Sequence, residues 1–156
     1  KFKTDLSIVN SVVSSNEKRK ILLTKRLSKI LNNKLKDKVI TFLGVTFKPN
    51  TDDMREASSI PMIKYLNKKN LKIRYYDPTG EKNEFKKLKN VKYYKNISSA
   101  CFNCDLIVIH TEWNEFKLLN FKKLVKKKNF KIFDMRNIYS PSKMRNLKIK
   151  YFGIGR

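Results

Sequence analysis

The amino-acid sequence predicts an α/β fold with a doubly wound, mainly parallel sheet preceded by a long helix. From residue 38 onward, short apolar and β-branched runs alternate with helical stretches, a pattern typical of βαβ crossovers. Several runs are continuously apolar, Leu106–Ile109 most clearly, as expected of parallel strands covered on both faces. The 156 residues suffice for one domain with a buried core and an appendage. Together these features predict a Rossmann-like architecture.

The expected strands are rich in β-branched and aromatic residues and occupy residues 38–45, 72–76, 91–94, 106–111, 130–133 and 149–153. The expected helices lie between them, near residues 59–69, 96–104, 120–127 and 141–146. Start signals support two of these helices. Pro61 falls in a first helical turn after Ser58 and Ser59, and Asn120 is a good N-cap for the helix that follows it.

Residues 4–33 show apolar positions at helical spacing, interrupted by a polar window at residues 14–16. The pattern fits either one helix with a polar window or two helices. A continuous helix would be ~45 Å long, which suggests a connector or an oligomer contact, although a plain packing helix fits equally well. We therefore divide the chain into a connecting or dimerisation helix at 1–36 and a Rossmann-like domain at 37–156.

The charge is strongly basic, with 37 Lys and Arg against 13 Asp and Glu and a net charge of +24. Such an excess is typical of nucleic-acid-binding proteins. Here, however, 30 of the 37 are scattered lysines, and the chain has 16 Asn and only two Ala, a composition that AT-rich coding produces. Specific recognition of phosphates or bases favours arginine, and only seven arginines are present. We therefore attribute the positive charge to a bias in amino-acid composition and expect no nucleic-acid partner. A basic nucleic-acid-binding module is the alternative.

Composition excludes several other classes. The apolar fraction of 40% excludes intrinsic disorder, and no run approaches the ~18 apolar residues of a membrane span. Two cysteines make no disulfide scaffold, so the expected compartment is the reducing cytoplasm. The N-terminus is neither a signal peptide nor a start methionine, so the chain can begin inside a longer protein.

Three polar segments follow expected strands: residues 46–56, 111–116 and 134–137. Ligands of open α/β sheets bind beyond the carboxyl ends of the strands, so these segments form the expected site. Around the start of the first segment, the sequence has only Gly44 where a dinucleotide fingerprint requires G-x-G-x-x-G. Its cations, Lys48 and Arg55, instead favour an anionic ligand held by side chains, or pair with the three acids of the same loop.

Two further side chains stand at these strand ends. Trp113 is either a stacking platform or lid, or a large apolar plug at the domain edge. Arg136 either reaches the same crevice, where a planar cation suits carboxylate or phosphate, or forms a salt bridge with Asp134 or Glu112.

The C-x-x-C pair and the lone histidine carry weaker signals. Cys101 and Cys104 have no second cysteine pair or histidine cluster, so we expect no metal site and favour core packing over a redox pair. His110 ends a buried strand without a serine or cysteine at an obvious elbow, so no catalytic triad is expected.

The same segments carry a family resemblance. Residues 47–56, FKPNTDDMRE, resemble the F-K-P-N-T-D-D-x-R-E signature of UDP-glucose/GDP-mannose dehydrogenases. Residues 111–116 resemble the T-E-W segment of that family, residues 133–139 its F-D-G-R-N-x-Y segment, and residues 153–156 its closing G-I-G-R. The helix containing Asn16 is similar to the helix that joins the central and C-terminal domains.

The resemblance implies a C-terminal, Rossmann-like domain that binds a UDP-sugar, with Phe47, Lys48 and Arg136 at substrate-contacting positions. It implies that Arg55 contacts NAD bound mainly by a separate N-terminal half, and that the full enzyme forms a homodimer through its central helical region. The implied reaction is the NAD-dependent oxidation of a sugar 6-hydroxyl to a carboxylate through a cysteine-bound intermediate, most commonly UDP-glucose to UDP-glucuronate.

The chain departs from the family pattern in two ways. Met135 stands where the family has glycine, a replacement that a left-handed backbone would resist. The catalytic cysteine and the G-x-G-x-x-G segment lie upstream in the family, and Cys101 and Cys104 occupy positions of small apolar residues. We therefore expect the C-terminal portion of a longer enzyme, or a truncated, non-catalytic relic of one, that oxidises nothing alone.

Overall fold

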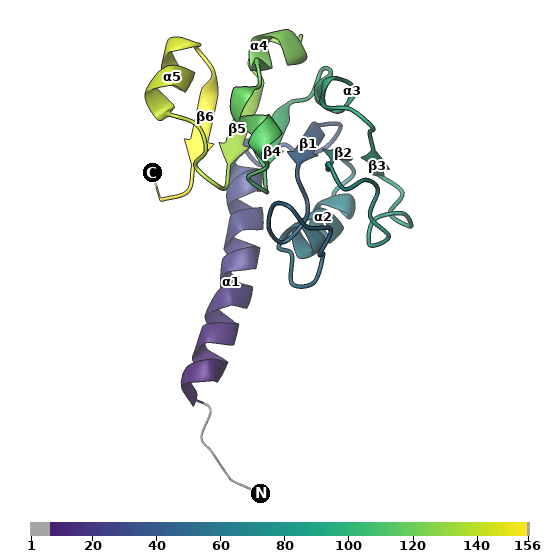
Figure 1. Cartoon of the computed structure of the whole chain (residues 1–156), viewed down its shortest axis with the longest axis vertical. Coiled ribbons are helices and arrows are strands. Elements are labelled where there is room, and N and C mark those ends of the chain that lie inside the picture. Colours follow the sequence, from purple (N-terminus) through teal and green to yellow (C-terminus); the bar gives the residue numbers. More distant parts are fainter. Residues whose placement is uncertain (1–6, 156) are drawn as a thin grey trace, which may run out of the picture.

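The computed structural model describes residues 7–155, which form a six-stranded parallel sheet (Figure 1). The strands are β1 (Val39–Leu43), β2 (Lys72–Tyr76), β3 (Val91–Tyr93), β4 (Leu106–Ile109), β5 (Lys131–Asp134) and β6 (Lys150–Gly153). Their order is β3-β2-β1-β4-β5-β6, and every neighbouring pair is parallel. This is the doubly wound Rossmann order, so the predicted fold class is confirmed.

The helices are α1 (Ser7–Ile30), α2 (Ser59–Asn67), α3 (Ile97–Cys101), α4 (Phe121–Leu124) and α5 (Pro141–Asn146). A 3-10 helix, η1 (Asn114–Leu118), was not predicted. The helices α3 and α4 are shorter than expected, because non-helical backbone at Phe102 and Val125 ends them. The Asn120 side chain accepts a hydrogen bond from the Lys123 amide at 3.2 Å, which confirms the predicted cap.

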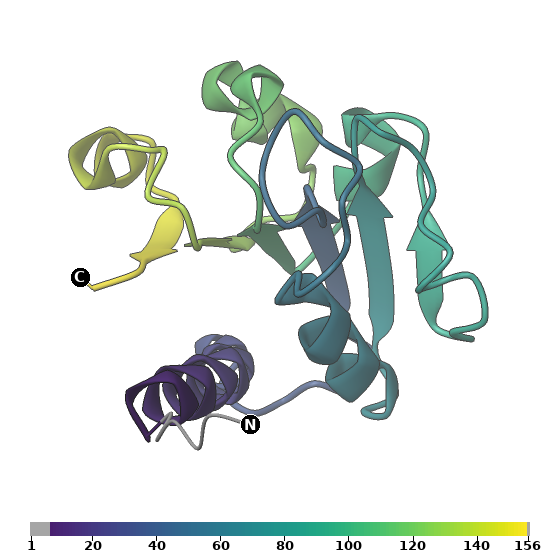
Figure 2. The same cartoon turned by 60° about the horizontal axis from the view of Figure 1, so that its bottom comes forward.

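The sheet separates two apolar layers. Along β4, Leu106 and Val108 face a cluster that includes α1 and α2, whereas Ile107 and Ile109 face a cluster that includes α3, α4 and α5. Figure 2 shows α1 and α2 on one side of the sheet and the other helices on the opposite side. Because both faces are covered, all four residues of β4 are buried, as its continuously apolar sequence predicted.

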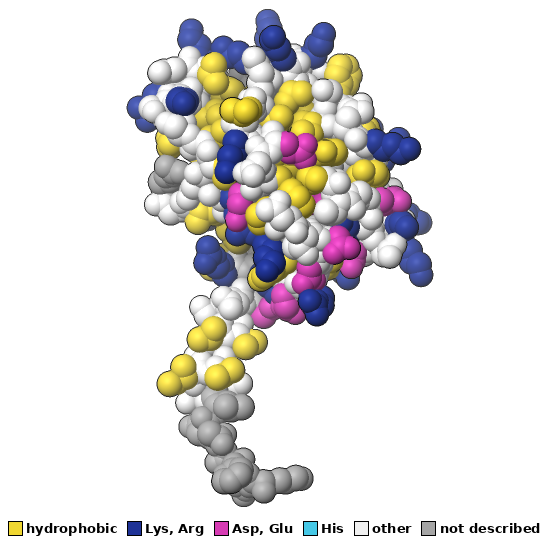
Figure 3. All heavy atoms as spheres, viewed as in Figure 1, with side chains coloured by type: hydrophobic (Ala, Val, Ile, Leu, Met, Phe, Trp, Pro, Cys, Tyr) yellow, Lys and Arg dark blue, Asp and Glu magenta, His cyan; other side chains and the backbone are white. Residues whose placement is uncertain are grey.

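The helix α1 is continuous through the polar window, which resolves the choice between one helix and two; positions 4–6 of the predicted helix lie outside the described residues. Its C-terminal turns are part of the core through Leu27 and Ile30, whereas its N-terminal half projects from the domain (Figure 1). Figure 3 shows apolar side chains on the projecting part. The exposed apolar residues of α1 are Ile8, Val9, Val12, Val13, Ile21 and Leu22.

Many turns of the described chain contain a residue with a left-handed backbone conformation. Among the residues other than glycine that adopt a positive φ, seven are asparagines: Asn32, Asn33, Asn50, Asn70, Asn103, Asn129 and Asn137. Asparagine tolerates this conformation better than other side chains because its short amide bonds to the local backbone. No helix within residues 7–155 has both the length and the apolarity that a membrane span requires.

Candidate functional site

A cleft of about 490 Å³ lies between α1 and the carboxyl edge of the sheet. The α1 residues in its wall are Val13, Asn16, Glu17, Arg19, Lys20 and Leu23. The residues from the sheet edge are Phe47, Glu56, Ser58, His110, Met135, Arg136 and Ile154. The cleft therefore occupies the edge at which parallel sheets bind ligands, as the strand-end rule predicted.

Arg136 links the three segments that sequence analysis singled out. Its Nε donates to the carbonyl oxygen of His110 at 2.8 Å, and its Nη2 donates to the carbonyl oxygen of Phe47 at 3.2 Å. The Nε also lies 2.9 Å from a carboxylate oxygen of Glu112, so one of the two predicted salt bridges is present. These contacts hold the guanidinium at the cleft with Nη1 uncommitted among the described residues. Arg136 is thus positioned to donate to an anionic or oxygen-rich ligand.

Met135 does not disturb this arrangement. Its backbone is not left-handed, and its amide donates to the carbonyl oxygen of Ile109 at 3.0 Å, while its side chain packs against the core. The left-handed residue of this segment is Asn137, with φ 55°. A left-handed backbone is therefore not needed immediately before Arg136 in this chain.

Of the other predicted site residues, Phe47 lines the cleft, whereas Lys48 and Arg55 are not part of its wall. Phe47 is half-exposed and lines the cleft, whereas its exposed neighbour Lys48 is not part of the wall. Arg55 forms a two-pronged contact with Asp53, Nε to Oδ1 at 3.0 Å and Nη2 to Oδ2 at 2.9 Å. Hydrogen bonds from the Arg55 side chain and amide lower the pKa of Asp53 to about 2. Of the two roles open to Arg55, pairing within its own loop is the one this structure contains.

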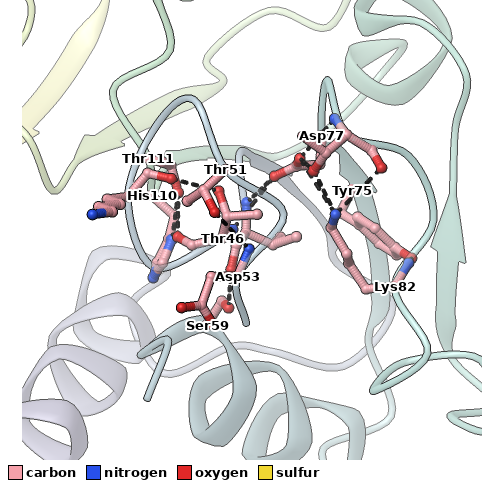
Figure 4. A network of polar contacts seen from close by, with 12 residues as sticks. Thr46, Thr51, Asp53, Ser59, Tyr75, Asp77, Lys82, His110 and Thr111 are labelled. Carbon is pink, nitrogen blue, oxygen red and sulfur yellow. Dashed lines mark hydrogen bonds and ion pairs between the residues drawn. The ribbon is translucent and has the colours of Figure 1, made fainter. Parts of the chain in front are cut away.

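The loop that carries Phe47 is anchored by Asp77, which directly follows β2 (Figure 4). One carboxylate oxygen of Asp77 accepts from the amide of Val45 at 2.8 Å, and the other accepts from the amide of Thr79 at 3.0 Å. The buried Lys82 ammonium lies 3.8 Å from Asp77 and also donates to the Thr79 hydroxyl. A buried ion pair with its hydrogen bonds satisfied thus holds the start of this loop.

A second anchor joins the loop to the end of β4. The Thr111 hydroxyl donates to the carbonyl oxygen of Thr46 at 2.8 Å (Figure 4). Gly44 lies so close that a Cβ there would be 2.6 Å from the Cβ of Thr111, and its φ is +73°. The loop therefore approaches β4 at a distance and in a conformation that only glycine allows.

The helix α1 contributes a wall of the cleft that was not predicted from the sequence. Lys20 pairs with Glu17 at 2.7 Å and with Glu56 of the first loop at 2.9 Å, so it connects the helix to the loop across the cleft. The hydrogen bonds that the Lys20 ammonium donates to both carboxylates raise the pKa of Lys20. Arg19 lines the same wall and has no ion pair among the described residues. The polar window was the available signal, because Asn16 within it faces the cleft.

Ser58 and His110, 52 positions apart, meet at the cleft. The Nε2 of His110 lies 2.8 Å from the Ser58 hydroxyl, and its Nδ1 lies 3.0 Å from the Thr111 hydroxyl. The His110 side chain is buried, and desolvation, aided by the nearby Arg136, lowers its pKa to about 3. The ring is therefore neutral at physiological pH.

This burial predicts acid sensitivity. The unfolded chain protonates His110 below its ordinary pKa of 6.5, whereas the folded chain resists protonation down to about 3. The unfolded state thus binds more protons in this window, and the free energy of unfolding should fall by about 2 kcal/mol from pH 8 to pH 5 through this group. Urea denaturation of the wild type and of His110→Gln at both pH values isolates the contribution of His110 to this loss of stability. An equal loss in both proteins would contradict the prediction.

The cysteines belong to the core, and the tryptophan packs against it. Cys101 and Cys104 are buried free thiols, and desolvation raises the pKa of both, that of Cys104 to about 12. Trp113 packs against the cluster on the α3–α5 side and is not part of the cleft wall, which is the behaviour of an apolar plug. The described residues contain no cluster of three or more His, Cys, Asp or Glu suited to a metal ion.

Comparisons with known proteins identify the family of this chain. Residues 41–141 match the model of the UDP-glucose/GDP-mannose dehydrogenase family, UDP binding domain. The UDP-glucose 6-dehydrogenase of Rickettsia felis is 36% identical over 97% of this chain and 34% of the relative, and that of Rhizobium meliloti is 33% identical over 98% and 35%. A solved UDP-D-ManNAc dehydrogenase from Pyrococcus horikoshii superposes with a TM-score of 0.77 at 25% identity, over 99% of this chain and 35% of that one.

The chain therefore spans about a third of the length of the relatives it matches. The matched region runs from β1 to the start of α5 and contains the loop of Phe47, the end of β4 and the segment of Arg136. These are the parts of the chain that converge at the sheet edge beside α1. The family match, the relatives and the fold agree, and the chain belongs to the UDP-glucose/GDP-mannose dehydrogenase family, of which it contains the C-terminal UDP-binding domain.

Proposed function

We propose that this chain is the UDP-sugar-binding portion of an NAD-dependent nucleotide-sugar 6-dehydrogenase, with UDP-glucose as the substrate and UDP-glucuronate as the product. The observation that carries the proposal is the convergence of Phe47 and Arg136 on one cleft at the carboxyl edge of the sheet. Phe47 offers an aromatic face for a base or sugar, and Arg136 offers hydrogen-bond donors for oxygen atoms. Lys48, exposed beside Phe47, adds a cation near this cleft.

Within residues 7–155, the loop after β1 does not form a dinucleotide cradle. The loop after β1 has Gly44 alone, and that glycine is packed against Thr111 instead of facing an open turn. Arg55 pairs with Asp53 in its own loop, but its side chain is exposed at the surface. In our proposal it contacts NAD that is held mainly by an N-terminal half of the enzyme. We place residues 1–36 as the connector to that half and residues 37–156 as the substrate domain, within a cytoplasmic enzyme.

The chain alone is proposed to be inactive in oxidation. A cysteine nucleophile must be accessible and readily ionised. Cys101 and Cys104 are buried, and desolvation raises the pKa of both thiols, so neither fits that role. The exposed apolar side chains on the projecting half of α1 support the proposed homodimer of the full enzyme, because such a stripe is stable when a partner covers it.

Calorimetric titration with UDP-glucose tests the assigned cleft. Arg136→Ala should weaken binding about tenfold or more, because hydrogen bonds from a charged donor are lost, and Lys48→Ala should weaken it less. Arg145→Ala is the matched control, since this exposed arginine on α5 lies outside the cleft. Equal affinities for all four proteins would contradict the site, and a salt-sensitive affinity for DNA exceeding that for UDP-glucose would favour the nucleic-acid-binding alternative.

A further inference from the structure

The hydrogen-bond chain through His110 has a fixed direction. The Thr111 hydroxyl has one hydrogen and donates it to the carbonyl oxygen of Thr46 at 2.8 Å. Toward His110, 3.0 Å away, the same hydroxyl must therefore act as acceptor, so the Nδ1 of His110 carries the proton. Because the ring is neutral, its Nε2 is bare and accepts from the Ser58 hydroxyl at 2.8 Å.

The direction of these hydrogen bonds determines whether Ser58 donates to a ligand or accepts from it. Its single hydrogen is committed to His110, so toward the cleft the Ser58 oxygen presents lone pairs alone. His110 also accepts from Arg136 through its backbone carbonyl. One buried residue thus positions a donor, the Arg136 guanidinium, and an acceptor, the Ser58 oxygen, in the wall of the same cleft.

A nucleophilic role for Ser58 does not fit these contacts. Serine nucleophiles require a histidine that takes up their proton and a partner that stabilises the resulting imidazolium. The Nδ1 of His110 faces a threonine hydroxyl instead of a carboxylate, and its buried ring stands near the positive charge of Arg136. The pair is therefore arranged to hold a hydrogen-bond direction and not to transfer a proton.

We propose that Ser58 is a specificity-determining residue that accepts a hydrogen bond from one hydroxyl of the bound sugar nucleotide, and that His110 is the positioning residue that makes Ser58 an acceptor. The proposal rests on the proposed function and adds a selection rule to it. A ligand group at this place must donate, so a hydroxyl is accepted and a fluorine, which cannot donate, is disfavoured.

The test uses calorimetric titration of the 156-residue chain with UDP, UDP-glucose and the series of UDP-glucose analogues in which one sugar or ribose hydroxyl is replaced by fluorine. The wild type should bind one analogue about five- to tenfold more weakly than UDP-glucose, the loss expected for one unmade hydrogen bond. Ser58→Ala should bind UDP-glucose and that analogue equally. The matched control is Ser98→Ala, an exposed serine on α3 outside the cleft, which should discriminate like the wild type.

A second measurement needs no variant. His110 is the only histidine of the chain, so its ring nitrogens give unambiguous signals in a ¹H–¹⁵N NMR correlation spectrum. The spectrum should show a protonated Nδ1 and a bare Nε2 at neutral pH. A protonated Nε2 would overturn the inference, because Ser58 would then have a hydrogen to donate to the cleft.

The outcomes separate the two proposals. If the wild type binds neither UDP nor UDP-glucose, and Arg136→Ala behaves identically, the proposed function fails and this inference fails with it. If the wild type binds UDP-glucose and Arg136→Ala weakens it, but Ser58→Ala retains the wild-type ranking of all analogues, only the role of Ser58 is overturned.

Discussion

Replacing Asp77 by alanine should lower the free energy of unfolding by about 3–5 kcal/mol, the cost of breaking a buried ion pair by removing one partner. The Lys82 ammonium is 5% exposed and would lose its counter-ion. The amides of Val45 and Thr79 would lose their acceptor at the same time. Urea denaturation monitored by circular dichroism measures the loss.

Two companion variants assign the cause. Asp77→Asn keeps a side-chain oxygen for one loop amide but removes the charge, so its cost should be intermediate. Adding Lys82→Met to Asp77→Ala removes the stranded cation and should recover part of the loss, since apolar residues replace buried ion pairs at little cost. A double variant as unstable as Asp77→Ala would show that the loop amides, and not the ion pair, dominate.

Gly44→Ala should cost about 2–4 kcal/mol of unfolding free energy and should also weaken UDP-glucose binding. A left-handed φ of +73° costs an alanine roughly 1 kcal/mol or more, and the new Cβ would lie 2.6 Å from the Cβ of Thr111. Thr111 is buried and bonded to Thr46, so relief requires the loop to move away from β4 and to carry Phe47 with it.

Gly80→Ala is the matched control for this variant. Its φ of +88° imposes a similar backbone strain, yet a Cβ there meets no atom within 4 Å. It should therefore cost roughly 1 kcal/mol and leave UDP-glucose affinity unchanged. Equal costs at Gly44 and Gly80, measured by urea denaturation, would show that contact with Thr111 is unimportant.

The sheet could be predicted from the sequence because its signals are local. The run over β4 is continuously apolar, and the run over β2 alternates buried and more exposed residues. The alternation of such strands with helices predicts parallel crossovers. The strand-end rule likewise brought Phe47 and Arg136 to one edge, and the structure places both at one cleft. What sequence analysis left open was which partner each cation takes, since Arg55 has a carboxylate two residues away and Arg136 draws on three segments.

The parts of the cleft that could not be predicted depend on long-range packing. Helical periodicity shows that α1 is amphipathic but not that Lys20 reaches Glu56, 36 positions further along the chain. Ser58 resembled an ordinary N-cap, yet its hydroxyl makes no capping bond and is directed to His110 instead. Neither residue carries a local pattern that indicates this pairing.

The asparagines with a positive φ suggest how this fold accommodates a change in amino-acid composition. A chain with only four glycines still turns sharply wherever a positive φ is required, because asparagine substitutes at modest energetic cost. A coding bias that enriches asparagine can therefore place asparagine at many positions of positive φ without changing the path of the backbone. Gly44 marks the limit of such a change, since close packing there admits no side chain.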